Sequence, residues 1–291
     1  MKNIKESYYK TNSMHTILMV ILSPRIFIQV FFTVIIILRD FFYLQTRLVP
    51  RKKRPPFVNI DHEIDNNIPF APEWVNIYIS FIGLWVYTVT WMFFAFKRKS
   101  VPYIVKSLKE VKLIYLTAGS IYRKCQSTTT RPAPVEGDRT FALIHKMDPH
   151  LNCMPSLHVM IVTWAAYSLV PRITELASDY KNNSDIKEIT DYIENRACLI
   201  TESILYIKQH SINCIPAALY VMQNLFPGFE DQYEKTFINC LFITSHPPVK
   251  DREKLILFME KLYDKFRNEN TDLNFKQKII NFLNSYPKQY R

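Results

Sequence analysis

Long apolar runs separated by short charged clusters form the main pattern of the chain as far as Phe226. Ile26 to Leu38 is almost entirely apolar, and Phe41 to Leu44 extends this run beyond a charged pair. Val75 to Phe96 holds 22 residues without a charge. A helix needs about 20 apolar residues to cross the hydrocarbon of a bilayer. These runs therefore predict membrane-spanning helices.

The first apolar stretch begins near Thr16 and is interrupted at Pro24 and Arg25. It is longer than the core of a signal peptide, and it lacks a small-residue cleavage site. We therefore interpret it as a retained span and not as a cleaved leader.

Three later segments are weaker candidates for spans because they are short or contain charges. Leu157 to Val170 is apolar but short for a bilayer. Ala197 to Phe226 is interrupted around His210 and predicts two spans that meet there, after a polar insert at roughly Ile173 to Arg196. Val101 to Tyr122 is compatible with lipid only in its second half, because the run carries Lys106, Lys109, Glu110 and Lys112.

Together these patterns predict an all-α protein, a polytopic membrane helical bundle of about six spans with a soluble helical C-terminal tail. We expect an N-terminal segment (1–25), a membrane domain (26–226) and the tail (227–291). The tail alternates charged and apolar residues at helical spacing, as in Asp251 to Phe266 and Asn274 to Leu283. The expected localisation is integral to a membrane, with several passes.

Composition narrows the candidate chemistry. The 291 residues carry a formal net charge of +11, which suits anionic lipid headgroups or nucleic acid. No nucleic-acid-binding signature accompanies the charge, so we expect no nucleic-acid partner. With only 4 Gly, a glycine-rich phosphate loop is excluded. The 5 Cys lack metal-type spacing, and we interpret them as small apolar residues, with no disulfide framework, metal or cofactor expected.

Several polar side chains fall at the ends of the predicted spans: Lys124, Arg131, His158, Lys208 and His210. Polar groups in a membrane are costly, so they usually face a cavity or a partner. Each one taken singly is explained equally well by a long side chain that reaches out of the membrane to water.

Taken together, these residues form three motifs. The first runs from Lys124 through six residues to Arg131 and Pro132, the second is Pro-Ser-Leu-His ending at His158, and the third is Lys-Gln-His ending at His210. In order and spacing they resemble the signature motifs of the type 2 phosphatidic acid phosphatase superfamily, which includes lipid phosphate phosphatases and phospholipid headgroup transferases. The resemblance covers about Asp65 to Ala218, including a loop at 65–72 that is similar to one common in that family.

The resemblance implies a membrane enzyme that dephosphorylates a lipid phosphate without a metal. His210 would be the nucleophile that forms a phosphohistidine, and His158 would protonate the leaving oxygen. A phosphate is bound mainly by positive charge and by N–H donors. Those groups would be the Arg131 fork, the cations of Lys124 and Lys208, the Ser156 hydroxyl and the Leu157 backbone N–H at a helix N-terminus.

Two positions depart from the family pattern. Ile204 stands where the family usually has Arg, and Cys214 stands where it has the Asp that orients the nucleophilic imidazole. A thiol is a poor acceptor, so the Cys would weaken the enzyme unless Asn213 or a backbone carbonyl takes over.

Two alternatives stay open. The first is a headgroup transferase of the same superfamily, suggested by the bulky Leu157, and the second is an inactive relative that serves as a membrane binding or interaction protein. The remaining histidines are interpreted as surface or loop residues: His15, His62, His145, His150 and His246. Basic loops flank both sides of the spans, so the positive-inside rule selects no orientation. The resemblance implies a site on the non-cytoplasmic face.

Overall fold

The structure is a computed structural model that describes residues 4–46, 48–133, 135, 139–147, 149–179, 183–229, 231–269 and 272–290. Most of this chain is helical, as predicted. The helices before the first strand are α1 (Ile4–Tyr9), α2 (Ser13–Leu22) and α3 (Pro24–Ile37), and α3 continues as a π-helical segment, η1 (Leu38–Tyr43).

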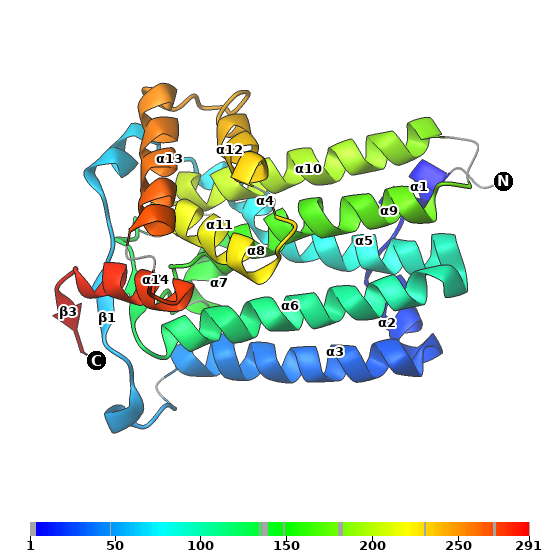
Figure 1. Ribbon diagram of the computed structural model, residues 1–291, viewed down its shortest axis with the longest axis horizontal. Coiled ribbons are helices and arrows are strands. Elements are labelled where there is room, and N and C mark those ends of the chain that lie inside the picture. Colours follow the sequence, from blue (N-terminus) through cyan, green and yellow to red (C-terminus); the bar gives the residue numbers. More distant parts are fainter. Residues whose placement is uncertain are drawn as a thin grey trace.

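A bundle of long helices lies along the horizontal axis of Figure 1. Its members are α3, α5 (Phe81–Phe96), α6 (Val101–Tyr122), α8 (Leu157–Trp164) with α9 (Val170–Leu176), and α10 (Asn183–Tyr206). The short helix α4 (Val75–Ile79) leads into α5, and α7 (Arg139–Met147) lies between α6 and α8 in the sequence. Short 3₁₀ turns complete this region: η2 (Arg51–Lys53), η3 (Glu63–Asn67), η4 (Pro72–Trp74) and η5 (Lys97–Ser100).

The helix that begins at Leu157 is longer than predicted. A π-helical segment, η6 (Ala165–Leu169), joins α8 directly to α9, so the helix continues to Leu176. The predicted polar insert at 173–196 forms the end of α9 and the first half of α10. In α10 the apolar residues Ile186, Ile189 and Ile193 are buried, so this part of the insert is an amphipathic helix.

One of the charges in the predicted third span, Glu110, has structural partners. Arg172 of α9 donates to Glu110 of α6 at 2.6 Å and to the hydroxyl of Ser107 at 2.7 Å. The indole N–H of Trp164 donates to the other Glu110 oxygen at 2.9 Å. Glu110 therefore faces the bundle interior, where an ion pair with added hydrogen bonds satisfies it.

Two stretches of the described chain are long and apolar enough to cross a membrane: Pro24–Tyr43, and Pro72–Tyr122, which contains α4, α5 and α6. In the first stretch only 17% of the apolar window is buried inside the protein. Large apolar side chains of α3 are exposed, among them Phe27, Phe31, Phe32 and Ile35, and so is Leu38 of η1. Such a continuous exposed apolar face marks a surface that contacts something other than water.

The C-terminal helices are part of the same hydrophobic core. They are α11 (Cys214–Leu225), α12 (Asp231–Cys240), α13 (Arg252–Asn268) and α14 (Phe275–Asn284), and the last three gather at one end of the bundle (Figure 1). Met259 and Tyr263 of α13 are fully buried against α11, and the Tyr263 hydroxyl donates to Gln223 at 2.7 Å. The predicted soluble tail is therefore helical but is docked on the bundle.

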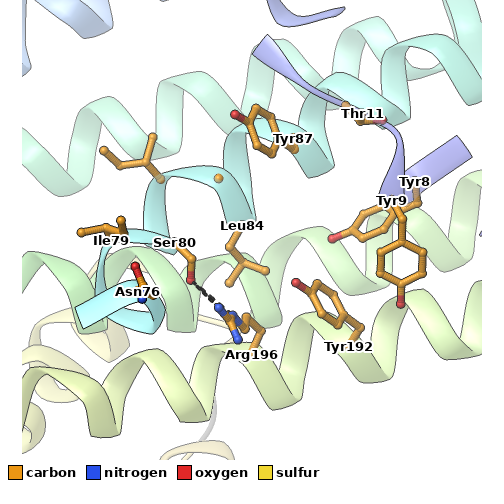
Figure 2. A pocket seen from close by; sticks show the side chains of 12 residues that line it. Tyr8, Tyr9, Thr11, Asn76, Ile79, Ser80, Leu84, Tyr87, Tyr192 and Arg196 are labelled. Carbon is orange, nitrogen blue, oxygen red and sulfur yellow. Dashed lines mark hydrogen bonds between the residues drawn. The ribbon is translucent and has the colours of Figure 1, made fainter. Parts of the chain in front are cut away.

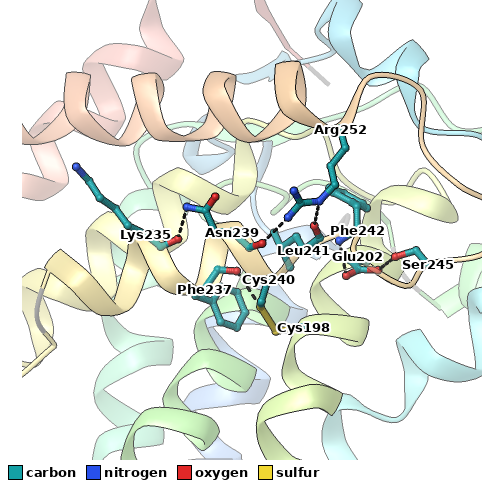
Figure 3. The surroundings of a disulfide bond; sticks show 10 residues. All are labelled: Cys198, Glu202, Lys235, Phe237, Asn239, Cys240, Leu241, Phe242, Ser245 and Arg252. Atoms are coloured by element: carbon teal, nitrogen blue, oxygen red, sulfur yellow. Dashed lines mark hydrogen bonds between the residues drawn. A yellow bond between two sulfur atoms is a disulfide. The ribbon is translucent and has the colours of Figure 1, made fainter.

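A disulfide bond between Cys198 of α10 and Cys240 of α12 fastens this docking (Figure 3). The interpretation of every Cys as a simple apolar residue was wrong for this pair. One helical turn after Cys198, Glu202 accepts the backbone N–H of Phe242 at 2.8 Å and the hydroxyl of Ser245. The covalent bond and the two hydrogen bonds hold the segment after α12 against the second half of α10.

The described chain also contains a small sheet that the all-α prediction lacked. Strand β1 (Phe57–Asn59) pairs in parallel with β2 (Gln126–Thr128) and antiparallel with β3 (Lys288–Gln289). Strand β2 lies inside the first of the three sequence motifs. Runs of three residues or fewer are too short to give a period-2 pattern that would identify a strand.

Candidate active site

Three segments that carry the sequence motifs meet at the end of the bundle where α6 ends, α8 begins and α10 ends. The backbone N–H of Ser127 donates to Leu151, and that of Cys153 donates to Ser127, both at 3.1 Å. These bonds join the first motif to the second. The third motif is joined to the second through Nδ1 of His210, which lies 2.9 Å from the carbonyl oxygen of Cys153.

The two imidazoles of the second and third motifs are neighbours. The ring centroids of His158 and His210 lie 5.5 Å apart, with the planes inclined at 74°. The second and third motifs therefore place their imidazoles in contact. The rings of Tyr78 and Phe81 lie 4.4 and 4.2 Å from that of His158 and fix its position from the side of α4 and α5.

The hydrogen bond to Cys153 defines the tautomer of His210. A carbonyl oxygen can only accept, so Nδ1 carries the proton and Nε2 keeps a lone pair in the neutral ring. His210 lies in the loop between α10 and α11, and burial lowers its pKa to about 4, despite the favourable bond to Cys153. The ring is therefore neutral near pH 7, with Nε2 as the basic nitrogen. The backbone carbonyl takes the orienting role that Cys214 cannot perform.

Lys208 supports the His210 loop and does not reach toward the two imidazoles. Its backbone has φ 56°, in the left-handed region that ends a helix, and its ammonium donates to the carbonyls of Asp65 and Ile68 at 2.9 and 2.5 Å. The Asp65 carboxylate accepts the N–H of Ile212 at 2.8 Å, and burial raises the pKa of Asp65. Burial also lowers the pKa of Lys208. These contacts dock the 65–68 loop against the turn that carries His210.

The helix that begins at Leu157 directs its N-terminus toward the site. Ser156 is fully buried, and its hydroxyl caps the helix by accepting the N–H of Val159 at 3.4 Å. The hydroxyl is thus used as an N-cap. Leu157 lines the small cavity beside the imidazoles, so its backbone N–H lies at a position where helix N-termini favour anions.

The two cations of the first motif differ in position. Arg131 is half-buried, and its guanidinium donates to the side-chain oxygen of Gln209 at 2.8 Å. Because Gln209 precedes His210, this bond places the positive charge of Arg131 next to His210, the candidate nucleophile. That charge adds to the effect of burial in lowering the pKa of His210. Lys124 is exposed just after the end of α6 and does not line the cavity.

A third histidine lies at the site: His150 is in a loop, as predicted, but it is buried beside the other two imidazoles. His150 is 5% exposed, its Nε2 lies 2.7 Å from the hydroxyl of Thr129, and its ring contacts the Cys153 thiol. Burial and the nearby Arg131 lower the pKa of His150 to about 2, so this ring is neutral. No sequence signal distinguished it, because it reaches the site through a left-handed backbone turn (φ 61°) and a contact with the distant Thr129.

These side chains surround a cavity with room for about one water molecule. The side chains that line it come from four separate segments of the chain and are Phe41, Gln45, His150, Asn152, Cys153, Leu157, His158 and His210. Phe41 and Gln45 come from the end of the first apolar helix, which sequence analysis did not connect with the site. The amide of Asn152 donates to the carbonyl of Phe41 at 3.3 Å and holds that end in place.

In the part of the chain that the structure describes, no group of three or more His, Cys, Asp or Glu side chains is arranged to hold a metal ion. Comparison with known proteins gives no match to any family model, curated protein or solved structure.

Proposed function

We propose that this chain is a multi-pass membrane phosphatase that hydrolyses a lipid phosphate through a phosphohistidine on His210. The observation that carries the proposal is the adjacent pair of imidazoles, 5.5 Å apart, in which a carbonyl hydrogen bond leaves Nε2 of His210 as the nucleophilic atom. Arg131 and the N-terminus of α8 supply positive potential beside it.

The reaction runs in two steps. Nε2 of His210 attacks phosphorus, the bond from phosphorus to the lipid oxygen breaks, and His158 gives a proton to that oxygen. Water then attacks the phosphohistidine, loses a proton to His158 and releases inorganic phosphate. The Cys153 carbonyl stabilises the ring throughout, since the Nδ1–H bond strengthens as positive charge develops on the attacking imidazole.

The exposed apolar face of α3 supports placement in a membrane. This helix ends in η1, whose Phe41 closes the histidine cavity, so the site lies at the level where the apolar helix ends. A lipid phosphate presents its headgroup at that level while its acyl chains stay in hydrocarbon. We propose that α3, α5 and α6 cross the bilayer, and that the motif end of the bundle meets the headgroups.

The test uses full-length protein purified in detergent with excess EDTA, supplied with lipid phosphates that carry radiolabelled phosphate. We expect phosphate release and a labelled enzyme that is acid-labile and alkali-stable, as phosphohistidine is. His210→Ala abolishes the label, whereas His15→Ala, on exposed α2 at the other end of the bundle, leaves it unchanged. Label that persists in His210→Ala refutes the proposed nucleophile.

The second candidate is an inactive relative that binds lipid without turnover. It is favoured by the small cavity and by the engagement of Lys208 with two backbone carbonyls. The same assay separates the two, because an inactive relative gives neither release nor label while the melting temperature shows intact folding.

A further inference from the structure

A separate groove of about 530 Å³ lies between α1, the α4–α5 junction and α10 (Figure 2). Its volume is within the range of small-molecule sites, about 300–1,000 Å³. Ser80, at the break between α4 and α5, and Arg196 of α10 lie at one end, and an aromatic group of Tyr8, Tyr9 and Tyr192 lies at the other.

Arg196 carries a positive charge into this groove. Its Nη2 and Nε both donate to one atom, the Ser80 hydroxyl oxygen, at 3.0 and 3.2 Å. Among the described residues, no carboxylate lies within ion-pairing distance of this guanidinium. A guanidinium has five donors in a planar fork, so Arg196 keeps donors for a carboxylate or phosphate.

The rest of the groove is suited to a hydrocarbon chain. Ile79, Ile82 and Leu84 form an aliphatic wall on α4 and α5, and Gly83 leaves space beside the ring of Tyr87. A Cβ at Gly83 would lie 3.3 Å from that ring, so a larger residue there would occupy the groove.

The aromatic end is held rigidly. The rings of Tyr8, Tyr9 and Tyr192 meet edge to face, with centroids 5.3 to 5.9 Å apart. The Tyr8 hydroxyl lies 3.0 Å from that of Thr88, and the Trp91 indole donates to Ser7 at 3.1 Å, which fastens α1 to α5. The groove is therefore built by contacts on three elements and does not depend on one surface residue.

We infer that this groove binds a single-chain amphiphile with an anionic headgroup, the headgroup on Arg196 and the chain toward the tyrosines. A fatty acid and a lysophosphatidate share this chemistry. The inference does not rest on the proposed phosphatase activity. The groove is nevertheless close to the histidines, since Tyr78 and Phe81, which contact His158, flank Ile79 and Ser80 in the sequence.

The test measures binding of oleate, lysophosphatidate and neutral monoolein to full-length protein in phosphatidylcholine nanodiscs. We expect Arg196→Gln to weaken binding of both anions by about tenfold or more and to change monoolein binding less than about twofold, since a hydrogen bond to a charged group is lost. Lys187→Gln, which removes an exposed charge of the same helix outside the groove, leaves binding unchanged. Gly83→Leu weakens binding of all three. His210→Ala binds as wild type, which separates this site from the phosphatase proposal.

Equal losses in Arg196→Gln and Lys187→Gln, or equal binding of oleate and monoolein by wild type, would overturn the inference. If Arg196→Gln does not fold, the wild-type protein is labelled with a photoreactive diazirine fatty acid and the labelled peptides are identified. Label on peptides that contain Tyr9 or Tyr192 supports the groove, whereas label confined to the exposed face of α3 overturns it. A preference for lysophosphatidate over oleate would identify the headgroup as phosphate.

Discussion

The position of Cys214 gives the sharpest test of how His210 is oriented. If the orienting carboxylate of the family pattern were simply missing, Cys214→Asp would restore it and raise turnover by about tenfold or more. The structure predicts no such gain, because the Cys153 carbonyl already accepts Nδ1–H at 2.9 Å. A ring with a fixed acceptor gains nothing from a second one.

The substitution should instead be costly. Cys214 is fully buried, and the carboxylates of Asp61 and Asp65 lie close enough to act on it electrostatically. A new buried charge beside two like charges, without a cation of its own, costs about 3–5 kcal/mol. For a chain of this size that corresponds to a fall in melting temperature of about 10 °C.

The assay pairs thermal unfolding in detergent with single-turnover formation of the phosphoenzyme. Cys214→Asn is the matched control, because it has the shape of the Asp variant without the charge, and it should cost only about 1–3 kcal/mol as a buried polar group. We expect the labelling rate per folded molecule to be unchanged in both variants. A tenfold faster rate in Cys214→Asp with an unchanged melting temperature would refute the carbonyl's role.

Three further outcomes are expected. The pKa of His210 in the folded protein is about 4, below the ordinary value of 6.5, so phosphoenzyme labelling should persist down to about pH 5. For the same reason the stability of the fold should decrease as the pH drops from about 6.5 toward 4. Labelling that is already lost above pH 6 would contradict this. Arg172→Met should destabilise the bundle by about 3–5 kcal/mol by leaving Glu110 buried without its partner, and the double variant with Glu110→Gln should recover most of the loss, measured by thermal unfolding. The disulfide from Cys198 to Cys240 closes a loop with a sequence separation of 42, so its reduction should destabilise the fold by about 4 kcal/mol. A reductant should therefore lower the melting temperature of the wild type and leave that of the variant with both cysteines changed to Ser unaffected.

The sequence motifs located the centre of the site because they are short and local. Pro-Ser-Leu-His predicted a helix that begins at Leu157, and α8 begins there, with Ser156, which was expected to bind phosphate, as its N-cap. The position of His210 between two apolar segments likewise predicted the break between α10 and α11. Local capping and turn chemistry can be recognised in a few residues, and these predictions depended on nothing more distant.

The features of the site and the fold that the sequence did not predict depend on contacts between segments that are distant in the sequence. His150 joins the site through Thr129, and Lys208 is turned toward Asp65 by a loop far from it in the sequence. The pairing of Cys198 with Cys240 depends on how α12 docks, which neither spacing nor composition encodes. For the same reason the acceptor for His210 could be named only as Asn213 or a backbone carbonyl, and not as Cys153.

Hydropathy alone does not separate helices that cross a membrane from helices that are buried inside the protein. Lipid and protein interior are both apolar, so an apolar helix fits either. Every residue of α8 is buried inside the protein, and so is α11 from Cys214 to Met222, so the core of the bundle accounts for their composition. The composition of α3 has no such explanation, since most of its large side chains are exposed. The apolar helices that could cross a membrane are therefore α3 and the stretch that contains α5 and α6, whereas the exposed charges of Lys187 and Glu188 require the outward face of α10 to meet water or a polar partner.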